Sequence, residues 1–285
     1  MDSLPGVAVV TGAARGIGAA IATAFVESGC RRLAITDILS SELTNLHQSL
    51  LTHFGSLGLT VFSLYGDITS ESFIDEFITG AQATFGRIDY LVNVAGVSKP
   101  FNRSIDVPSS EFDFINNVNS RAAWLCSRAV LRVMLSQEPL PSPDSEQDTA
   151  ATTTGPQGSS RWRRPPQRGS IVNVASQLGI VSRPGASAYC ASKAAVIGMT
   201  RADAIDYSKD LIRVNCVCPG LVSTDMTTSS EGVVNEGLAG SVEIAPMGRM
   251  GDVREVADCV LFLSSWRASF VQGHAMVVDG GYVIN

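Results

Sequence analysis

The sequence predicts a doubly wound α/β fold, in which a seven-stranded parallel sheet carries helices on both faces. Short runs of β-branched residues alternate with amphipathic helical patterns, as expected where helices connect parallel strands. The alternation resumes after one proline-rich interruption and shows no internal repeat. The chain has 285 residues, of which 45% are hydrophobic, and this is enough to bury a substantial core.

The first half of the chain contains four predicted strands, each followed by a helical pattern. The strands are expected at VAVVTG (7–12), RLAITD (32–37), LTVFSLYGD (59–67) and IDYLVNVAG (88–96). The helices are expected to run to about Ser28, through Leu50, to Phe85, and from about Ser110 to Leu135. Because a helix returns the chain after each strand, neighbouring strands are expected to be parallel.

The second half of the chain continues the alternation of strands and helices with three more strands. They are expected at GSIVNVAS (169–176), IRVNCVCPG (212–220) and AMVVDGG (275–281), with helices near 187–208 and 252–264. Since both halves are needed to complete one sheet, the chain is expected to form a single domain over residues 1–285.

The segment between the halves, Gln137 to Arg168, departs from this pattern. It holds six of the twelve prolines, and only Leu140 and Trp162 are large apolar side chains. Such a segment buries too little surface to offset the entropy of ordering it, and it far exceeds the usual helix-to-strand connection. We expect residues 137–168 to be a disordered surface insertion at the sheet edge where strands begin. A basic docking or nuclear-import role stays open for Arg161, Arg163, Arg164 and Arg168.

The charge balance and the absence of signals exclude several classes of partner. With a formal net charge of −6, the chain lacks the basic field that attracts nucleic acid or an anionic membrane surface. No apolar run reaches the length of a membrane span, and the first residues show no secretory signal. The six cysteines have no paired C-x-x-C spacing and are expected to be reduced thiols. These features predict a cytoplasmic protein.

A glycine-rich loop joins the first predicted strand to the first helix. It reads TGAARGIG (11–18) and runs directly into AAIATAF, which has helical spacing. Glycines allow a tight turn and close approach of a pyrophosphate, whose charge is stabilised by the N–H groups and dipole at the helix start. The position between a strand and a helix favours a dinucleotide site over an ordinary turn.

The cofactor choice depends on two side chains beside this loop. Asp37 ends the second strand, nineteen residues after Gly18. A carboxylate there accepts both hydroxyls of the adenosine ribose and repels a 2′-phosphate, which indicates NAD. Arg15 lies inside the loop and could reach a 2′-phosphate, so NADP stays open.

Four polar residues form the predicted catalytic group. Tyr189 and Lys193 are four residues apart in SAYCASKAAV and hence lie on one helix face. An ammonium beside a phenol lowers the phenol pKa, so the pair can act as general acid and base on an alcohol or ketone. Ser176 ends the fifth strand, where its hydroxyl can hold the substrate oxygen. Asn119 lies in the long helix, and its amide needs a partner, for which a lysine-linked water would make a proton relay.

With these motifs in place, the chain resembles the short-chain dehydrogenase/reductase family, in its compact single-domain branch with a Rossmann fold. The resemblance covers the whole chain except the insertion. The matching residues are TGAARGIG (11–18), Asp37, GDI (66–68), NVAG (93–96), Asn119, Ser176, YCASK (189–193), PG followed by VSTDM (219–226), GRMGDVREVADCVLFLSS and the final VDGG.

The resemblance implies a role for each matched residue. It makes Ser176, Tyr189 and Lys193 a catalytic triad and Asn119 a relay residue. The chain departs from the family at Val94, where asparagine is more frequent, and at 120–122, which lack a frequent glycine. The implied cofactor-binding residues are Gly12, Arg15, Gly16, Ile17 and Gly18 in the loop, Asp37, Asp67 and Ile68 at the adenosine, Asn93, Ala95 and Gly96 beside the ribose, Pro219, Val222 and Thr224 at the nicotinamide, and Tyr189 and Lys193.

Two other enzyme chemistries are disfavoured. The three histidines, His47, His53 and His274, lack zinc-ligand spacing, so no metal site is predicted. Ser176 has no G-x-S-x-G elbow around it and no histidine placed to activate it, which argues against a hydrolase.

The predicted reaction interconverts a secondary alcohol and a ketone on a lipophilic small molecule such as a terpenoid, steroid-like or polyketide ring, with oxidation by NAD as the expected direction. The walls of the substrate pocket are expected beyond the carboxyl ends of the strands, from residues 97–104, 177–187 and 223–248. The apolar residues expected there are Leu178, Val181, Met226, Val233, Val234 and Leu238.

Two alternatives remain beside this prediction. One is an NADPH-dependent ketone or 3-oxoacyl reductase. The other is a non-catalytic dinucleotide sensor that uses the arginine-rich segment as an interaction arm. The resemblance also implies a homodimer or homotetramer, formed through the long helices on either side of the insertion.

Overall fold

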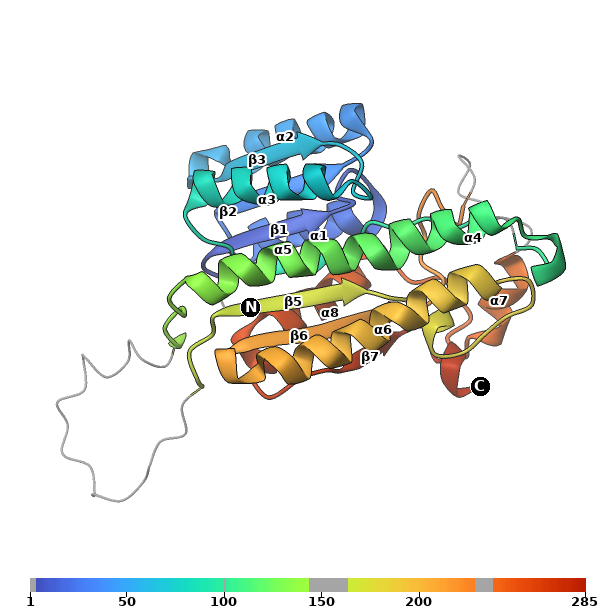
Figure 1. The fold of residues 1–285 in the computed structure, drawn as a ribbon. Coiled ribbons are helices and arrows are strands. Elements are labelled where there is room, and N and C mark those ends of the chain that lie inside the picture. Colours follow the sequence, from blue (N-terminus) through green and yellow to red (C-terminus); the bar gives the residue numbers. More distant parts are fainter. Residues whose placement is uncertain (1–3, 100, 144–163, 229–237) are drawn as a thin grey trace, which may run out of the picture.

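The computed structural model describes residues 4–99, 101–143, 164–228 and 238–285 (Figure 1). Seven strands form one sheet, in the order β3-β2-β1-β4-β5-β6-β7, and every neighbouring pair is parallel. This confirms the predicted doubly wound α/β fold. The strands are β1 (Val7–Thr11), β2 (Arg32–Asp37), β3 (Thr60–Tyr65), β4 (Tyr90–Asn93), β5 (Gly169–Val174), β6 (Ile212–Pro219) and β7 (Ala275–Val278).

Helices connect the strands at the predicted places. They are α1 (Gly16–Glu27), α2 (Ser40–Phe54), α3 (Glu71–Phe85), α4 (Ser109–Asn116), α5 (Ala122–Ser136), α6 (Ser187–Tyr207), α7 (Ala239–Ile244) and α8 (Val253–Ser264). Of these, α7 is a further helix that the sequence pattern did not predict. Within the described ranges, no helix combines the length and the apolar character that a bilayer crossing requires.

The core lies in two layers, one on each face of the sheet. Neighbouring Val9 and Val10 of β1 belong to different clusters, because successive strand residues point to opposite faces. Figure 1 shows α3, α5 and α6 together on one face, while α1, α2 and α8 cover the other. The second layer is built from residues such as Ile21, Leu43 and Val260, which pack with Val10.

The sheet reverses its direction of growth at β1. The chain runs outward from β1 to β2 and β3, and then places β4 on the other side of β1. At such a reversal the loops that follow the two neighbouring strands leave in opposite directions and open a crevice at the carboxyl ends. The residues that end β1 and β4, Thr11 and Asn93, are direct partners in the ladder and lie at the base of this crevice.

The predicted long helix is interrupted where Asn119 lies. A π-helical turn, Asn117–Arg121, joins α4 to α5. Hydrophobic spacing does not reveal such a turn, because the apolar pattern continues through it. π-Helical turns inside α-helices often occur at functional sites.

The two ends of the predicted insertion are packed against the fold, which corrects the expectation that all of residues 137–168 are loosely ordered. Leu140 and Gln167 exchange two backbone hydrogen bonds of 2.8 and 3.1 Å. The Gln137 amide bonds the backbone N–H and carbonyl of Ile88 at 3.0 and 2.7 Å. Residues 144–163 lie outside the described residues, and so do two of the four arginines.

A buried cation holds the far end of this segment. Arg213 of β6 is only 8% exposed and donates to the Gln167 Oε1 at 2.8 and 3.1 Å. It also donates to the carbonyl of Leu263 at 2.6 Å. Burial lowers the Arg213 pKa to about 10. The sequence prediction missed this contact, because glutamine in a proline-rich segment carries no sign of burial.

Candidate functional site

A cavity of about 590 Å³ opens at the carboxyl ends of β1 and β4. All the sequence-predicted cofactor residues except Asn93 line it, and so do Ser176, Tyr189 and Lys193. The lining residues from the prediction are Gly12, Arg15, Gly16, Ile17, Gly18, Asp37, Asp67, Ile68, Ala95, Gly96, Pro219, Val222 and Thr224. The crevice at the sheet reversal therefore brings the glycine loop and the predicted catalytic group together.

The glycine loop is shaped by close backbone contacts. A Cβ on Gly18 would lie 1.9 Å from the Gly12 carbonyl oxygen, so a side chain there would break the turn. Gly12 has a φ of 64° and lies against Ala95, where a Cβ would lie 2.7 Å from the backbone nitrogen. The first turn of α1 contains no acidic residue. The N–H groups at this helix start could therefore hold a pyrophosphate, and the loop fits a dinucleotide.

Asp37 ends β2 at the rim of the cavity. One carboxylate oxygen accepts the Ala14 backbone N–H at 2.9 Å, and the other accepts the Leu39 N–H at 3.0 Å. Each oxygen keeps a lone pair for a further donor, such as a ribose hydroxyl. The carboxylate is thus oriented in advance by the loop that it would assist.

Arg15 does not point freely into the cavity. Its guanidinium makes a 3.1 Å ion pair with Asp225, which follows β6. The sequence prediction missed Asp225, because nothing in the spacing places residue 225 beside the first helix. A carboxylate partner so close competes for the charge that a 2′-phosphate would need.

Ser176, Tyr189 and Lys193 come from two segments of the chain, helix α6 and the segment after β5, and line the same cavity. Ser176 follows β5, and its Oγ accepts the Leu178 N–H at 3.1 Å. Lys193 is 4% exposed, donates to the Val174 carbonyl at 2.9 Å and lies 5.8 Å from the Tyr189 ring centroid. The three residues expected from the sequence to act together thus line one cavity.

Burial shifts the pKa values of two members of this group, Lys193 and Tyr189. Burial lowers the Lys193 pKa from 10.5 to about 8. Burial also raises the Tyr189 pKa, and the hydrogen bond from Ser176 opposes it only in part. Desolvation of the phenolate is the largest effect on the Tyr189 pKa, and the predicted lowering of this pKa by the lysine stays a prediction.

Asn119 is 1% exposed, and its side chain clamps the loop after β4. Its Oδ1 accepts the Val97 N–H at 2.7 Å, and its Nδ2 donates to the Val97 carbonyl and the Ser192 Oγ at 3.0 Å each. The chain itself thus supplies partners for the amide, and the lysine-linked water stays a prediction. Ser192 in turn donates to the Tyr189 carbonyl at 2.7 Å. Sequence reasoning missed Ser192, although it lies within YCASK beside the lysine.

Asn93 is the one predicted cofactor residue that turns away from the cavity. Its Nδ2 donates to the Asn173 Oδ1 at 2.8 Å and the Ser127 Oγ at 3.0 Å. This buried polar contact links β4, β5 and α5, which explains a polar side chain at the end of a core strand.

The expected apolar substrate wall is found only in part. Met226 lines the cavity and is 50% exposed, whereas Leu178 and Val181 do not line it. Leu238 lies in the described chain but not in the lining. Val233 and Val234 lie outside the described residues.

Comparison with known proteins identifies relatives over the full fold. The family model described as short chain dehydrogenase matches residues 6–139, and the one described as Enoyl-(Acyl carrier protein) reductase matches residues 159–283. Residues 140–158, within the predicted insertion, lie between the two matches. Among solved structures, levodione reductase superposes with a TM-score of 0.80 at 27% identity, covering 98% of this chain and 97% of that one.

Curated proteins are similar along nearly the whole chain. The short-chain dehydrogenase fogB of Aspergillus ruber is 36% identical, over 98% of this chain and 97% of its own length. The 2-(R)-hydroxypropyl-CoM dehydrogenase of Xanthobacter autotrophicus is 34% identical, over 97% of this chain and 98% of its own length. The chain therefore belongs to the short-chain dehydrogenase/reductase family, oxidoreductases that act on CH–OH and keto groups with NAD or NADP.

Proposed function

We propose that this protein interconverts a secondary alcohol and a ketone on a lipophilic small molecule, with NAD as the hydride carrier. One observation carries the proposal. Ser176, Tyr189 and Lys193 line the same cavity as the glycine loop and Asp37, so an acid/base group and a dinucleotide cradle share one space. An alcohol bound between them would be deprotonated and oxidised in one place.

Each member of the proposed triad has a separate task. The Ser176 hydroxyl holds the substrate oxygen beside the phenol. In oxidation, the Tyr189 oxygen takes the hydroxyl proton, and in reduction it returns the proton to the carbonyl oxygen. Lys193, anchored by the Val174 carbonyl, presents its charge to the phenol and the ribose. When bound, the nicotinamide supplies the hydride acceptor or donor, and its positive oxidised form favours the phenolate.

The proposal that NAD is preferred depends on Asp37 and Arg15. The Asp37 carboxylate would lie where a 2′-phosphate must fit, and Arg15 is partnered by Asp225. The alternative, an NADPH-dependent reductase, has a relative in the 3-oxoacyl-[acyl-carrier-protein] reductase FabG of Thermotoga maritima, which is 32% identical over 98% of both chains. Comparison of the dissociation constants for NAD and NADP decides between the two.

The remaining cavity residues receive positions along the dinucleotide. We place the pyrophosphate on the glycine loop and α1, and Met226 beside the substrate. Asp67 and Ile68 would hold the adenine, Ala95 and Gly96 the ribose, and Pro219, Val222 and Thr224 the nicotinamide amide. Asn119 acts in this proposal as a positioning residue, since its amide is used by Val97 and Ser192.

The decisive experiment replaces Tyr189 by phenylalanine. We expect the Tyr189→Phe variant to lose about a thousandfold in kcat, since general acid–base groups contribute about 10²–10⁴, while NAD affinity stays unchanged. Tyr207→Phe, at the other end of α6, is the matched control and keeps full activity. Turnover that survives in Tyr189→Phe would reject Tyr189 as the acid/base group. A wild-type protein that binds NAD but turns over no secondary alcohol or ketone would favour the alternative, a non-catalytic dinucleotide sensor.

We also propose that the protein is a cytoplasmic homodimer or homotetramer. Trp124 and Leu135 of α5 and Ile205 of α6 are 41%, 43% and 78% exposed, and a second copy would cover them. The six cysteines are free thiols, in keeping with a reducing compartment. Light scattering coupled to gel filtration measures the assembly, and a monomer would reject it.

A further inference from the structure

A second cavity, of about 330 Å³, lies beside the candidate site but opens between other elements. Its walls are the segments that follow β6 and β7, helix α7 and the start of α8. Gly220 forms the partition: a Cβ on it would lie 2.7 Å from the Asp279 Cα and 2.8 Å from the Gln177 Oε1. Val222 lines both cavities. The lining of the second cavity includes residues from two of the ranges expected for the substrate wall, 177–187 and 223–248, but none of the proposed triad or dinucleotide contacts except Val222 lines this second space.

One side of the cavity carries hydrogen-bond acceptors. Gln177 is 6% exposed, and its Oε1 has no hydrogen-bond partner in the part of the chain that is described. A buried amide oxygen without a donor costs about 1–3 kcal/mol. The terminal amide turns about a soft torsion, and rotation about it can present this oxygen to the cavity. The Asp279 carboxylate, which accepts the N–H groups of Gly281 and Val283 at 2.8 Å each, lies next to it.

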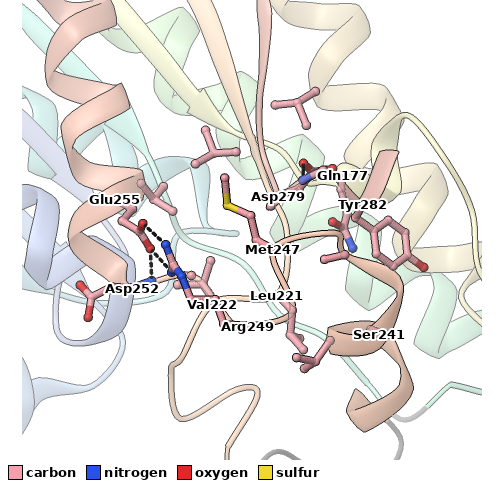
Figure 2. Close-up of a pocket in the computed structure, with 18 residues that line it drawn as sticks. Gln177, Leu221, Val222, Ser241, Met247, Arg249, Asp252, Glu255, Asp279 and Tyr282 are labelled. Carbon is pink, nitrogen blue, oxygen red and sulfur yellow. Dashed lines mark hydrogen bonds and ion pairs between the residues drawn. The ribbon is translucent and has the colours of Figure 1, made fainter. Parts of the chain in front are cut away.

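The opposite side is polar but already satisfied. Figure 2 shows Met247 between the two sides, with Gln177, Asp279 and Tyr282 on one of them and Arg249, Glu255 and Asp252 on the other. Arg249 makes a bidentate pair with Glu255, at 2.7 and 2.8 Å, and Glu255 also accepts the Asp252 N–H. Among the described residues of the lining, the only cation is therefore already neutralised.

The charge of the lining selects the ligand. Arg249 contributes one positive charge, and Glu255, Asp252 and Asp279 contribute three negative charges, which leaves a net charge of −2. An anion would meet no free cation among the described lining residues, whereas a cation with N–H donors would meet a carboxylate and an unpartnered amide oxygen. Aliphatic side chains line the remaining surface, among them Leu221, Val242, Ala245, Val256 and Val278.

We propose that this second cavity binds a small primary amine, with its ammonium on Gln177 and Asp279 and its aliphatic body along the apolar wall. The ammonium has three donors and can satisfy both acceptors at once. Gln177 directly follows Ser176, so the ligand would lie one residue away from the candidate catalytic wall.

The test uses the full chain without cofactor and reads binding alone, so its outcome does not depend on the proposed reaction. Three probes share a four-carbon body: n-butylammonium, n-butanol and butyrate. By titration calorimetry we expect saturable binding of n-butylammonium, about tenfold tighter than n-butanol because the head is charged, and no binding of butyrate. A crystal structure of the n-butylammonium complex should show the ligand between Gln177 and Asp279.

Variants of the lining residues test whether n-butylammonium binds in this cavity. Gln177→Met removes the acceptor at similar size and should weaken n-butylammonium about tenfold, whereas Gln177→Glu should tighten it by about the same factor. Gln48→Met, on an exposed face of α2, is the matched control. Met247→Arg tests the charge at a 68% exposed position, where folding is little affected, and should weaken the amine about fivefold.

Four results would overturn the proposal. They are the absence of saturable binding, equal affinity for n-butanol, affinities that Gln177→Met and Met247→Arg leave unchanged, and a complex in which the amine occupies the cofactor cavity or water alone contacts Gln177. Thermal unfolding of each variant identifies loss of the fold. Should Gln177→Met fail to fold, Met247→Arg and the probe series still decide the matter.

Discussion

The guanidinium of Arg15 lies 3.1 Å from the carboxylate of Asp225, and this pair ties the glycine loop to the segment after β6. The neighbouring Thr224 lies close to the same loop, since a Cβ on Gly16 would be 3.4 Å from its Cγ2. The two loops therefore meet at the cofactor cavity, which both of them line. Cofactor choice should then depend on Asp225 as well as on Asp37.

Asp225→Asn releases the Arg15 charge for a 2′-phosphate. Both side chains of the pair are more than half exposed, so the pair is worth less than about 1 kcal/mol and the effect is modest. We expect NADP to bind about threefold tighter, with the NAD dissociation constant unchanged, as measured by titration calorimetry. In Arg15→Ala/Asp225→Asn the gain should vanish. A gain that persists in the double variant would show that Arg15 is not its cause.

Asp37→Asn should reverse the order of the two cofactors. The substitution removes the negative charge that repels a 2′-phosphate and weakens the acceptor for the ribose hydroxyls. We expect NAD to bind about tenfold more weakly and NADP at least as tightly as in the wild type. Asp113→Asn, on the exposed face of α4, is the control. An unchanged ratio of the two dissociation constants would contradict the proposed role of Asp37.

Much of the fold and site follows from local sequence patterns. Strands and helices alternate with clear spacing, and the reversal at β1 gathers the glycine loop, Asp37 and Tyr189 without any further information. Local patterns fail where the partner is remote in sequence. The pairing of Arg15 with Asp225 and that of Gln167 with Arg213 depend on how loops fold back, and no periodicity reports this.

The pKa shifts of Tyr189 and Lys193 could not be predicted from the sequence either. A tyrosine and a lysine one helical turn apart suggest attraction between their charged forms, but the burial of both groups is set by the whole fold. Desolvation then dominates, so the Tyr189 pKa rises and the Lys193 pKa falls. The π-helical turn at Asn119 was hidden for a related reason, because its apolar pattern resembles that of a regular helix.

Asn119→Ala should destabilise the fold through the loop after β4. The variant leaves the Val97 N–H and carbonyl without their side-chain partner and removes a donor from Ser192. We expect the free energy of unfolding to fall by about 3 kcal/mol, since a buried unpaired group costs about 1–3 kcal/mol. Urea denaturation measures this. Asn116→Ala, one turn earlier, should cost much less, and equal losses in the two variants would contradict the clamp.

Changes in the middle of the insertion and changes at its ends should affect the stability of the fold differently. Replacing residues 144–163 by a short glycine–serine linker should leave the melting temperature and NAD affinity unchanged, because the retained ends include the Leu140–Gln167 bridge. Gln167→Ala should instead lower stability by about 3 kcal/mol, because it removes the acceptor of the buried Arg213. Differential scanning calorimetry compares both with the wild type. A large loss on linker replacement, or none in Gln167→Ala, would contradict this division.

Lys193→Met should change how stability depends on pH. Burial holds the Lys193 pKa at about 8 in the folded protein, against 10.5 ordinarily. Between these values the unfolded chain binds the lysine proton and the folded chain does not, so the stability of the wild type rises with pH there relative to Lys193→Met. The rise should total about 3 kcal/mol across the window and be absent below it. Urea denaturation from pH 7 to pH 10.5 measures it, with exposed Lys209→Met as control. If the stability difference between wild type and Lys193→Met stayed constant over this range, the lysine would not be desolvated.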